Sequence, residues 1–210
     1  MKSLYIFLCW WYTLFIHMEP SRARKAGDSV AIAANIVIVV LECVGLYISV
    51  SARRWQIFAY YTQLSNLVTL LSSLLFLVLG ARVAPLRYLS TCMLVMTFLI
   101  TAFVLVPMGG SFQKLMLSGN GLYHHTLCPI LSVCSYLLWE AHAALWLLPV
   151  AVTLLYGIVM LFLNARDRFD GPYPFFRVRH QSVAATVIWM AALIGLITLI
   201  DFAVIRVSRL

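Results

Sequence analysis

The stretch FAYYTQLSN, residues 58–66, opens an apolar segment that continues without a charged residue to Leu79. Its polar residues recur at spacings of three and four, so on a helix they form one stripe. A lipid-facing surface would not carry such a stripe, which indicates a helix that packs inside a bundle. Small hydroxyl residues commonly line helix–helix contacts, and periodicity alone favours that interpretation. The stripe consists of Thr62, Ser65, Asn66, Thr69, Ser72 and Ser73.

The composition places this helix in a membrane protein. Of the 210 residues, 63% are hydrophobic and only 10% are charged, which excludes an ordinary soluble domain. Six segments are long enough to cross a hydrocarbon core at about 1.5 Å per residue. We therefore expect an all-α, polytopic membrane bundle, with residues 21–210 forming one six-span domain. The predicted spans are 29–50, 56–79, 86–106, 121–139, 145–163 and 181–207.

Residues 1–20 have the charge order of a signal peptide but lack a small-x-small cleavage site. The segment is short for a span, and Trp10, Trp11 and Tyr12 favour the lipid–water boundary. We expect an uncleaved, apolar interfacial helix, with a short seventh span as the alternative.

Charge and cysteine usage argue against two other classes of protein. The formal charge of +8 comes from basic residues scattered through the short loops, which fits membrane orientation better than nucleic-acid binding. These residues divide evenly between the two expected sides, so the orientation stays open. The cysteines lack the spacing of a metal site, and the sequence suggests packing roles and no metal or organic cofactor. They are Cys9, Cys43, Cys92, Cys128 and Cys134.

A second polar cluster, His124-His125, lies near the start of the fourth predicted span, before a predicted kink at Pro129. In a six-span chain, spans two, four and six start from the same side. Thr62 and His124 then lie at depths of roughly 9 Å and 5 Å. Neighbouring helical residues point about 100° apart, so at most one histidine faces a given partner. Thr62 and one histidine are therefore a candidate nucleophile and base.

The loop DGPYPFFR, residues 170–177, lies on the same expected side. Its two prolines and three aromatic residues predict either a plug at the mouth of the bundle or an ordinary aromatic interface belt. We expect the loop between the third and fourth spans, residues 107–121, to be a chain-breaking connection.

Two carboxylates interrupt the predicted spans. Glu42 lies near the middle of the first span, where an ionisable group should face the bundle interior with a partner or water. Its role is either functional or structural. Asp201 falls near the opposite face from Thr62 and is a poor catalytic candidate.

Three short blocks give the chain a resemblance to a known family. They are the aromatic-x-Thr pattern ending at Thr62, an Asn-x-x-x-His-x-Thr-x-x-Pro spacing from Asn120 to Pro129, and the Tyr-Pro-Phe run at residues 173–175. In this order and with this span count, the chain resembles the androgen-induced and androgen-dependent six-span membrane proteins. These are intramembrane threonine hydrolases that cleave fatty acid esters of hydroxy fatty acids. The chain also resembles a bacterial six-span group, which favours the bacterial inner membrane.

The resemblance implies that Thr62 is the nucleophile and His124 the base. In the bacterial group the spacing from histidine to proline can be one residue shorter, which would select His125 instead. The resemblance extends over spans one to six and leaves residues 1–20 unmatched.

The chemistry is coherent, because a positioned histidine can take the threonine proton and later protonate the leaving alkoxide. The expected partners are membrane lipids and a lipid ester with a long acyl chain. The candidate substrate-binding residues, with Asn66, Tyr61 and Asn120 as possible oxyanion donors, are Glu42, Tyr61, Ser65, Asn66, Asn120, Tyr173 and Phe175.

Two other functions remain open at this point. One is a solute- or proton-coupled transport bundle that uses Glu42 and the polar stripe. The other is a structural or regulatory membrane protein without turnover.

Overall fold

The computed structural model describes residues 25–143, 145–170 and 173–208, so the predicted interfacial segment at residues 1–20 lies outside the described residues. Within these ranges the chain is all-helical and has no strand, as the sequence predicts. The long helices are α2 Lys25–Arg53, α3 Tyr61–Leu79, α4 Ala84–Ile100, α6 Cys128–Trp139, α7 Leu148–Ala165 and α8 Val183–Val207. The short elements are η2 Arg54–Ala59, η3 Gly80–Val83, η4 Thr101–Leu105, η5 Gln113–Leu117, α5 Gly119–Gly121, η6 Leu122–Leu127, η7 Pro174–Phe176 and η8 Val178–His180.

Four helical stretches within the described residues are long and apolar enough to cross a membrane, which indicates a membrane protein. The second, Tyr61–Leu105, is twice the necessary length and folds back at Gly80–Val83, where Gly80 has a φ of 59°. Glycine takes this left-handed conformation readily. The predicted span at 121–139 is helical but is not one of the four. The four stretches are Asp28–Ala52, Tyr61–Leu105, Leu148–Ala165 and Val183–Val207.

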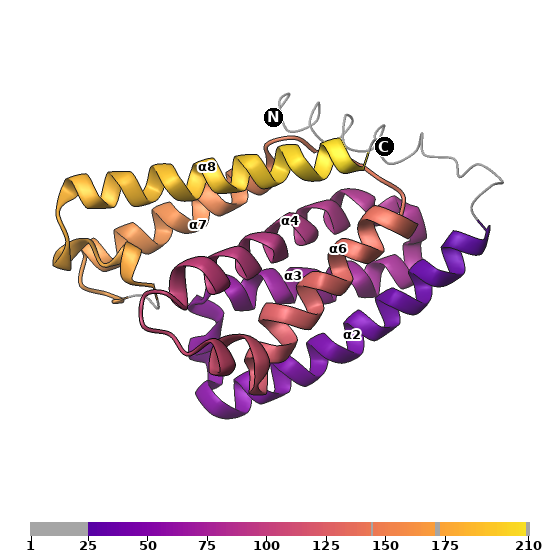
Figure 1. Cartoon of the computed structure of the whole chain (residues 1–210), viewed down its shortest axis with the longest axis horizontal. Helices are drawn as coiled ribbons and strands as arrows, with labels where there is room; N and C mark the ends of the chain where they lie inside the picture. The colour runs from indigo at the N-terminus through magenta and orange to yellow at the C-terminus, as the bar shows by residue number, and fades with distance from the viewer. Residues whose placement is uncertain (1–24, 144, 171–172, 209–210) are drawn as a thin grey trace, which may run out of the picture.

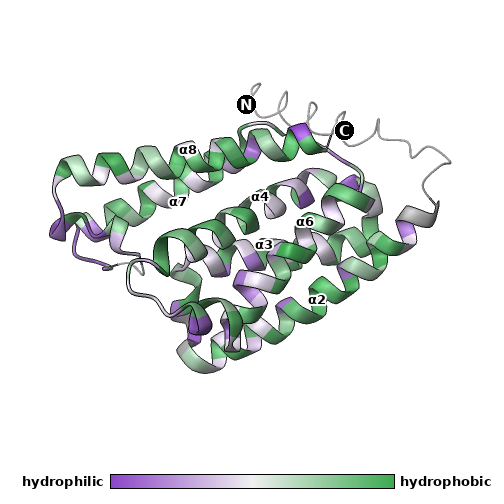
Figure 2. Cartoon of the chain, viewed as in Figure 1, coloured by the Kyte–Doolittle hydropathy of each residue, from purple (hydrophilic) through white to green (hydrophobic). Residues whose placement is uncertain are grey.

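The long helices form two groups (Figure 1). Helices α2, α3, α4 and α6 pack together, and the α7–α8 hairpin lies along α4. Apolar residues cover most of the helical length, and the loop that joins α7 to α8 is among the most hydrophilic parts of the chain (Figure 2). The end of the bundle with this loop also holds the start of α3 (Figure 1).

The polar stripe of α3 faces the interior, as its periodicity predicts. All six of its residues are buried, whereas Leu71 and Val78 on the other face are exposed. The Ser65 hydroxyl lies 2.8 Å from the Thr97 hydroxyl of α4, and Ser72 lies 3.0 Å from Ser90. The deeper part of the stripe therefore forms a hydrogen-bonded contact between α3 and α4.

Helix α3 begins at Tyr61, five residues later than the predicted start at residue 56. Residues Arg54–Ala59 form a 3₁₀ turn in which Arg54 has a φ of 52°, and Tyr60 is extended. These conformations break the helical path before Tyr61. Thr62 therefore lies in the first turn of α3, nearer the start of its helix than predicted.

The region between α4 and α6 is more helical than predicted. The expected loop at 107–121 contains the π-helical turn Gln113–Leu117. A second π-helical turn, Leu122–Leu127, carries both histidines and leads into α6, where the Cys128 amide donates to the Tyr123 carbonyl. Proline lacks an N–H, so Pro129 cannot complete a regular α-helical ladder here. The predicted irregularity lies in the turn before the proline.

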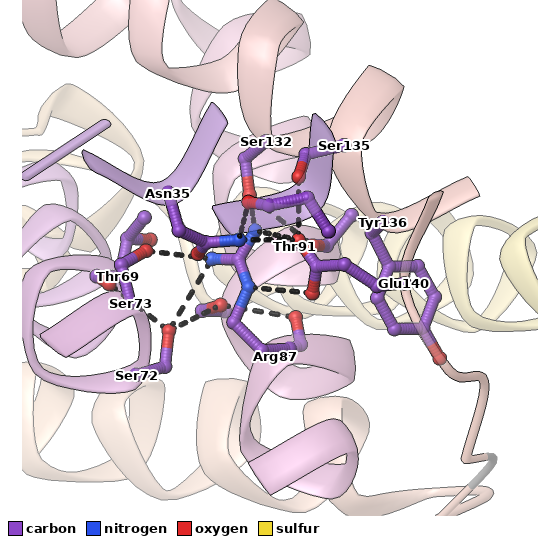
Figure 3. A network of polar contacts seen from close by, with 12 residues as sticks. Asn35, Thr69, Ser72, Ser73, Arg87, Thr91, Ser132, Ser135, Tyr136 and Glu140 are labelled. Carbon is purple, nitrogen blue, oxygen red and sulfur yellow. Dashed lines mark hydrogen bonds and ion pairs between the residues drawn. The ribbon is translucent and has the colours of Figure 1, made fainter. Parts of the chain in front are cut away.

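A buried ion pair links the helices at the end of the bundle opposite the start of α3 (Figure 3). Arg87 of α4 makes a bidentate contact with Glu140, with both N···O distances at 2.9 Å and both side chains at most 1% exposed. The remaining partners come from α2, α3 and α6 and are Asn35, Ser72, Ser73, Ser132 and Ser135.

We predict that Glu140→Leu lowers the free energy of unfolding by about 3–5 kcal/mol, because it leaves the Arg87 charge buried and unpaired. The double variant Arg87→Met/Glu140→Leu should recover most of this loss, since it removes both charges. Denaturant unfolding in detergent measures these changes.

Arg179→Ala is the matched control, because it removes two ion pairs whose carboxylates, Asp167 and Asp170, are largely exposed. Its effect should be about 1 kcal/mol or less. A loss as large as that of Glu140→Leu would contradict the role assigned to the buried pair.

Candidate functional site

Thr62 lies at the N-terminus of α3, where the first backbone amides of a helix lack partners within the helix. Two tyrosine hydroxyls from distant segments accept these hydrogen bonds. The Tyr61 amide donates to the Tyr156 hydroxyl of α7 at 3.1 Å, and the Thr62 amide donates to the Tyr173 hydroxyl at 3.3 Å. Thr62 is thus held between α3, α7 and the loop that precedes α8.

The aromatic loop covers this helix end as a plug. Tyr173, Phe175 and Phe176 are each less than 5% exposed, and the rings of Tyr173 and Phe175 stack with centroids 5.1 Å apart. This burial favours the plug over the interface belt. Burial raises the pKa of Tyr173 to about 12, so its hydroxyl stays protonated at neutral pH and can donate a hydrogen bond.

Two cavities meet at Thr62 and Tyr173. One, of about 680 Å³, has polar side chains in its wall and lies toward the end of the bundle that holds the start of α3. The other, of about 100 Å³, is almost wholly apolar and lies among α3, α4, α7 and α8. Both Thr62 and Tyr173 line both cavities. The Thr62 side chain therefore stands where a polar chamber adjoins an apolar one.

His125 lines the polar cavity together with Thr62. Its Nδ1 lies 2.7 Å from the Leu115 carbonyl oxygen. A carbonyl oxygen only accepts hydrogen bonds, so Nδ1 carries the proton and Nε2 of the neutral ring keeps its lone pair. In this tautomer Nε2 can accept a proton, as a general base must.

His124 points elsewhere, as expected for adjacent residues of a helix. Its Nδ1 lies 3.1 Å from the amide nitrogen of Gln63, and its Nε2 lies 3.3 Å from Glu42 Oε2. A Cβ atom at Gly45 would overlap the His124 ring, so this glycine lets the ring pack against α2. Among the described contacts, neither histidine hydrogen-bonds the Thr62 hydroxyl.

Of the candidate substrate-binding residues, Asn120 lines the polar cavity. Tyr61 and Phe175 line the apolar one. Asn66 donates to the backbone carbonyls of Thr62 and His124, so its amide nitrogen already has partners.

Ser65 and Glu42 lie apart from both cavities. Ser65 pairs with Thr97, and Glu42 lies beside His124. In addition, Asp201 accepts hydrogen bonds from Tyr88 and from the Leu147 amide at the far end of the bundle.

Sequence reasoning did not select three residues that the structure brings to the site. Gln63 and Lys114 line the polar cavity, and Tyr156 binds the first amide of α3. Gln63 lies within residues 58–66, and a polar amide on a membrane helix would have indicated a functional residue. Lys114 and Tyr156 carried no comparable pattern. The described residues contain no group of three or more histidine, cysteine, aspartate or glutamate side chains placed to hold a metal ion.

No protein-family model, no curated protein and no solved structure matches this chain. The family resemblance therefore rests on the three short sequence blocks.

We predict that Tyr173→Phe lowers the free energy of unfolding by about 1–3 kcal/mol, because it leaves the buried Thr62 amide without its acceptor. Tyr47→Phe removes a hydroxyl from a side chain that is 75% exposed and should have almost no effect. Thermal and denaturant unfolding in detergent compare the two variants. Equal stability of Tyr173→Phe and the parent chain would mean that this hydroxyl does not hold the helix end.

Proposed function

We propose that this chain is an intramembrane hydrolase that cleaves lipid esters, with Thr62 as nucleophile and His125 as general base. The observation that supports this most strongly is the position of Thr62 where the polar cavity, shared with His125, meets the apolar cavity. An ester bond at this point would have its acyl chain in an apolar chamber and its reacting carbonyl beside the base.

The reaction would follow the general course of acyl transfer. The Thr62 hydroxyl attacks the ester carbonyl carbon while Nε2 of His125 takes its proton. The tetrahedral intermediate then collapses, the C–O bond to the alcohol breaks, and the histidine proton goes to the leaving oxygen. A water molecule hydrolyses the acyl-threonine by the same steps. The Leu115 carbonyl would keep the His125 ring in the required tautomer.

The developing oxyanion needs hydrogen-bond donors. Asn66 is less suitable than the sequence suggests, because its amide donates to two backbone carbonyls. Tyr61 is also occupied, since its hydroxyl pairs with Thr153 at 2.8 Å. The Tyr173 hydroxyl accepts from the Thr62 amide and retains its own proton, and Asn120 lines the same cavity. Tyr173 and Asn120 are therefore the proposed donors.

The apolar cavity supports a lipid substrate. Its wall includes Leu154 and Ile158 of α7, which are 41% and 54% exposed on the outer surface of the bundle. A substrate could enter sideways from the bilayer between α7 and its neighbours. The resemblance to hydrolases of fatty acid esters of hydroxy fatty acids supports a long-chain ester, and the resemblance to the bacterial group supports the inner membrane.

Transport through Glu42 has less support. The space beside Glu42 and His124 is too small to admit a water molecule, so it offers no path for a solute.

We also propose that the bundle crosses the membrane six times. The fold-back at Gly80–Val83 divides Tyr61–Leu105 into two lengths of membrane dimension, and the continuous helical run from α5 through α6 supplies another. Thr62, His125 and the aromatic loop would then lie near one membrane face.

We predict that a fluorophosphonate probe labels the purified protein at Thr62. Thr62→Ala should abolish labelling, and Thr62→Ser should keep it. His125→Gln should slow labelling by about 10²–10⁴-fold, because the threonine loses its base. In-gel fluorescence over time gives these rates, and turnover of a panel of long-chain esters gives the matching activities.

His124→Gln is the matched control, since it changes the neighbouring imidazole and leaves the cavity-lining one in place. It should label within about tenfold of the parent rate. Labelling that survives in Thr62→Ala, or that depends on His124 and not His125, would reject the proposed pair. Folded parent protein that neither labels nor cleaves any ester would reject the hydrolase.

Single cysteines test the six crossings in a background without the native cysteines. Ser111→Cys and Asp167→Cys should react with a membrane-impermeant maleimide from one side of sealed vesicles, because both lie at the Thr62 end of the bundle. Arg82→Cys should react only from the other side. Reaction of all three from one side would contradict the proposed topology.

A further inference from the structure

Gly157 lies near the middle of α7, at a position where a glycine weakens a helix. Glycine on a membrane helix commonly lets two backbones approach closely. That explanation does not apply to Gly157, because the atoms nearest to a Cβ built there belong to the side chains of Phe176 and Met190, at 3.8 Å and 3.9 Å. An alanine would fit at ordinary contact distance, so the absent side chain calls for another explanation.

Glycine at this position leaves apolar space next to Thr62. Gly157, Phe176 and Met190 line the apolar cavity of about 100 Å³, and Thr62 lines it as well. Gly157 is buried, and a methyl group on it would lie between Phe176 and Met190, in the wall of this cavity. A side chain of the size of leucine would occupy much of the space. The residue type at position 157 therefore sets how much room adjoins the Thr62 side chain.

We propose that Gly157 is the specificity-determining residue for the acyl chain, because it leaves room for the first acyl carbons beyond the ester carbonyl. The inference rests on the proposed hydrolase, and it names the acyl group which that site accepts. An apolar cavity of about 150 Å³ holds one benzene molecule, so a volume of about 100 Å³ holds on the order of four carbon atoms. Only this short part of a long chain would lie inside the bundle.

The rest of a long chain has a route into the bilayer. Leu154 and Ile158 line the cavity and are also exposed on the outer surface of α7. They are four residues apart and therefore lie on one face of the helix. A chain that leaves the cavity past these two side chains reaches lipid, where no wall limits its length. The expected substrates are esters of straight-chain fatty acids, selected against branches near the carbonyl and not by total length.

Acyl selectivity tests this inference in proteoliposomes of the purified parent chain, with pairs of esters of one alcohol competing in the same vesicles. A hexadecanoyl ester should exceed its β-methyl analogue in kcat/KM, because an extra methyl group in a tight apolar site costs about 10–200-fold. Dodecanoyl and hexadecanoyl esters should agree within about threefold, since carbons that stay in lipid make no contact that changes in the transition state. Equal values for the straight and β-methyl esters would overturn the inference, as would a steep dependence on total length.

Substitutions assign the selectivity to position 157. Gly157→Leu should lose hexadecanoyl esters and keep acetyl esters, so the ratio of their kcat/KM values should fall about 100-fold. Gly195→Leu is the matched control, because Gly195 of α8 is exposed and a Cβ built there meets open space within 4 Å. It should keep the parental ratio. A structural defect would lower both esters together, so an unchanged ratio in Gly157→Leu would overturn the assignment.

Gly157→Ala is a second, milder variant, since its methyl group would touch only side chains. It should be at least as stable as the parent chain in thermal unfolding, because alanine favours the helix. It should also lower the kcat/KM of the β-methyl ester more than that of the straight-chain ester. Gly195→Ala shares the gain in helix propensity and should leave the selectivity unchanged. Parental selectivity in Gly157→Ala would contradict the inference.

Photo-crosslinking separates the cavity from catalysis. A palmitic acid probe with a diazirine on its γ-carbon should crosslink to α7 or to Pro174–Phe176 in the parent chain and in Gly195→Leu, and not in Gly157→Leu. Crosslinking at this place without cleavage of any ester would reject the hydrolase and keep the chain-binding role of Gly157. Cleavage of esters without crosslinking here, and with parental selectivity in Gly157→Leu, would keep the hydrolase and overturn the role of Gly157.

Discussion

The arrangement of the bundle depends on the ion pair between Arg87 and Glu140. A charge buried among apolar helices is tolerated only where nearly every donor and acceptor has a partner. The guanidinium has five N–H groups, and its three nitrogens make contacts with Glu140 and with three serine hydroxyls. Glu140 in turn accepts from Asn35 and Ser135. The pair therefore joins α2, α3, α4 and α6 at one end of the molecule (Figure 3).

This constraint fixes the rotation of α3 about its axis. Ser72 and Ser73 must face Arg87, and residues at multiples of three and four positions then face the same way. Ser65 follows on this face and meets Thr97, and Thr62 follows at its start. One stripe thus provides the helix contact along most of its length and the candidate site at its end. The packing interpretation of the stripe therefore applies to Ser65, Ser72 and Ser73, and the interpretation as a candidate site applies to Thr62.

Periodicity and composition predicted the helical class and the inward stripe, because each follows from local sequence. They left the aromatic loop open between a plug and an interface belt. The Arg87–Glu140 pair could not be predicted in this way, since its partners are separated by 53 residues and each resembles an ordinary loop charge. The start of α3 was also missed, because it depends on the backbone of Arg54 and Tyr60 and not on apolar pattern. Sequence left the choice between His124 and His125 open, since the answer depends on the rotation of a π-helical turn.

That turn separates the two histidines by environment. A π-helical turn inserts one extra residue per hydrogen bond, so it rotates the residues before Pro129 relative to α6. His124 then faces α2 and lies against Glu42, where Gly45 leaves space for the ring. His125 faces the polar cavity, with its Nδ1 held by the Leu115 carbonyl of the other π-helical turn. Residues that are neighbours in sequence therefore lie in two different environments, a closed polar cluster between α2 and α3 and an open cavity beside Thr62. Gln63 lines both, so its side chain stands between the closed cluster and the cavity beside Thr62.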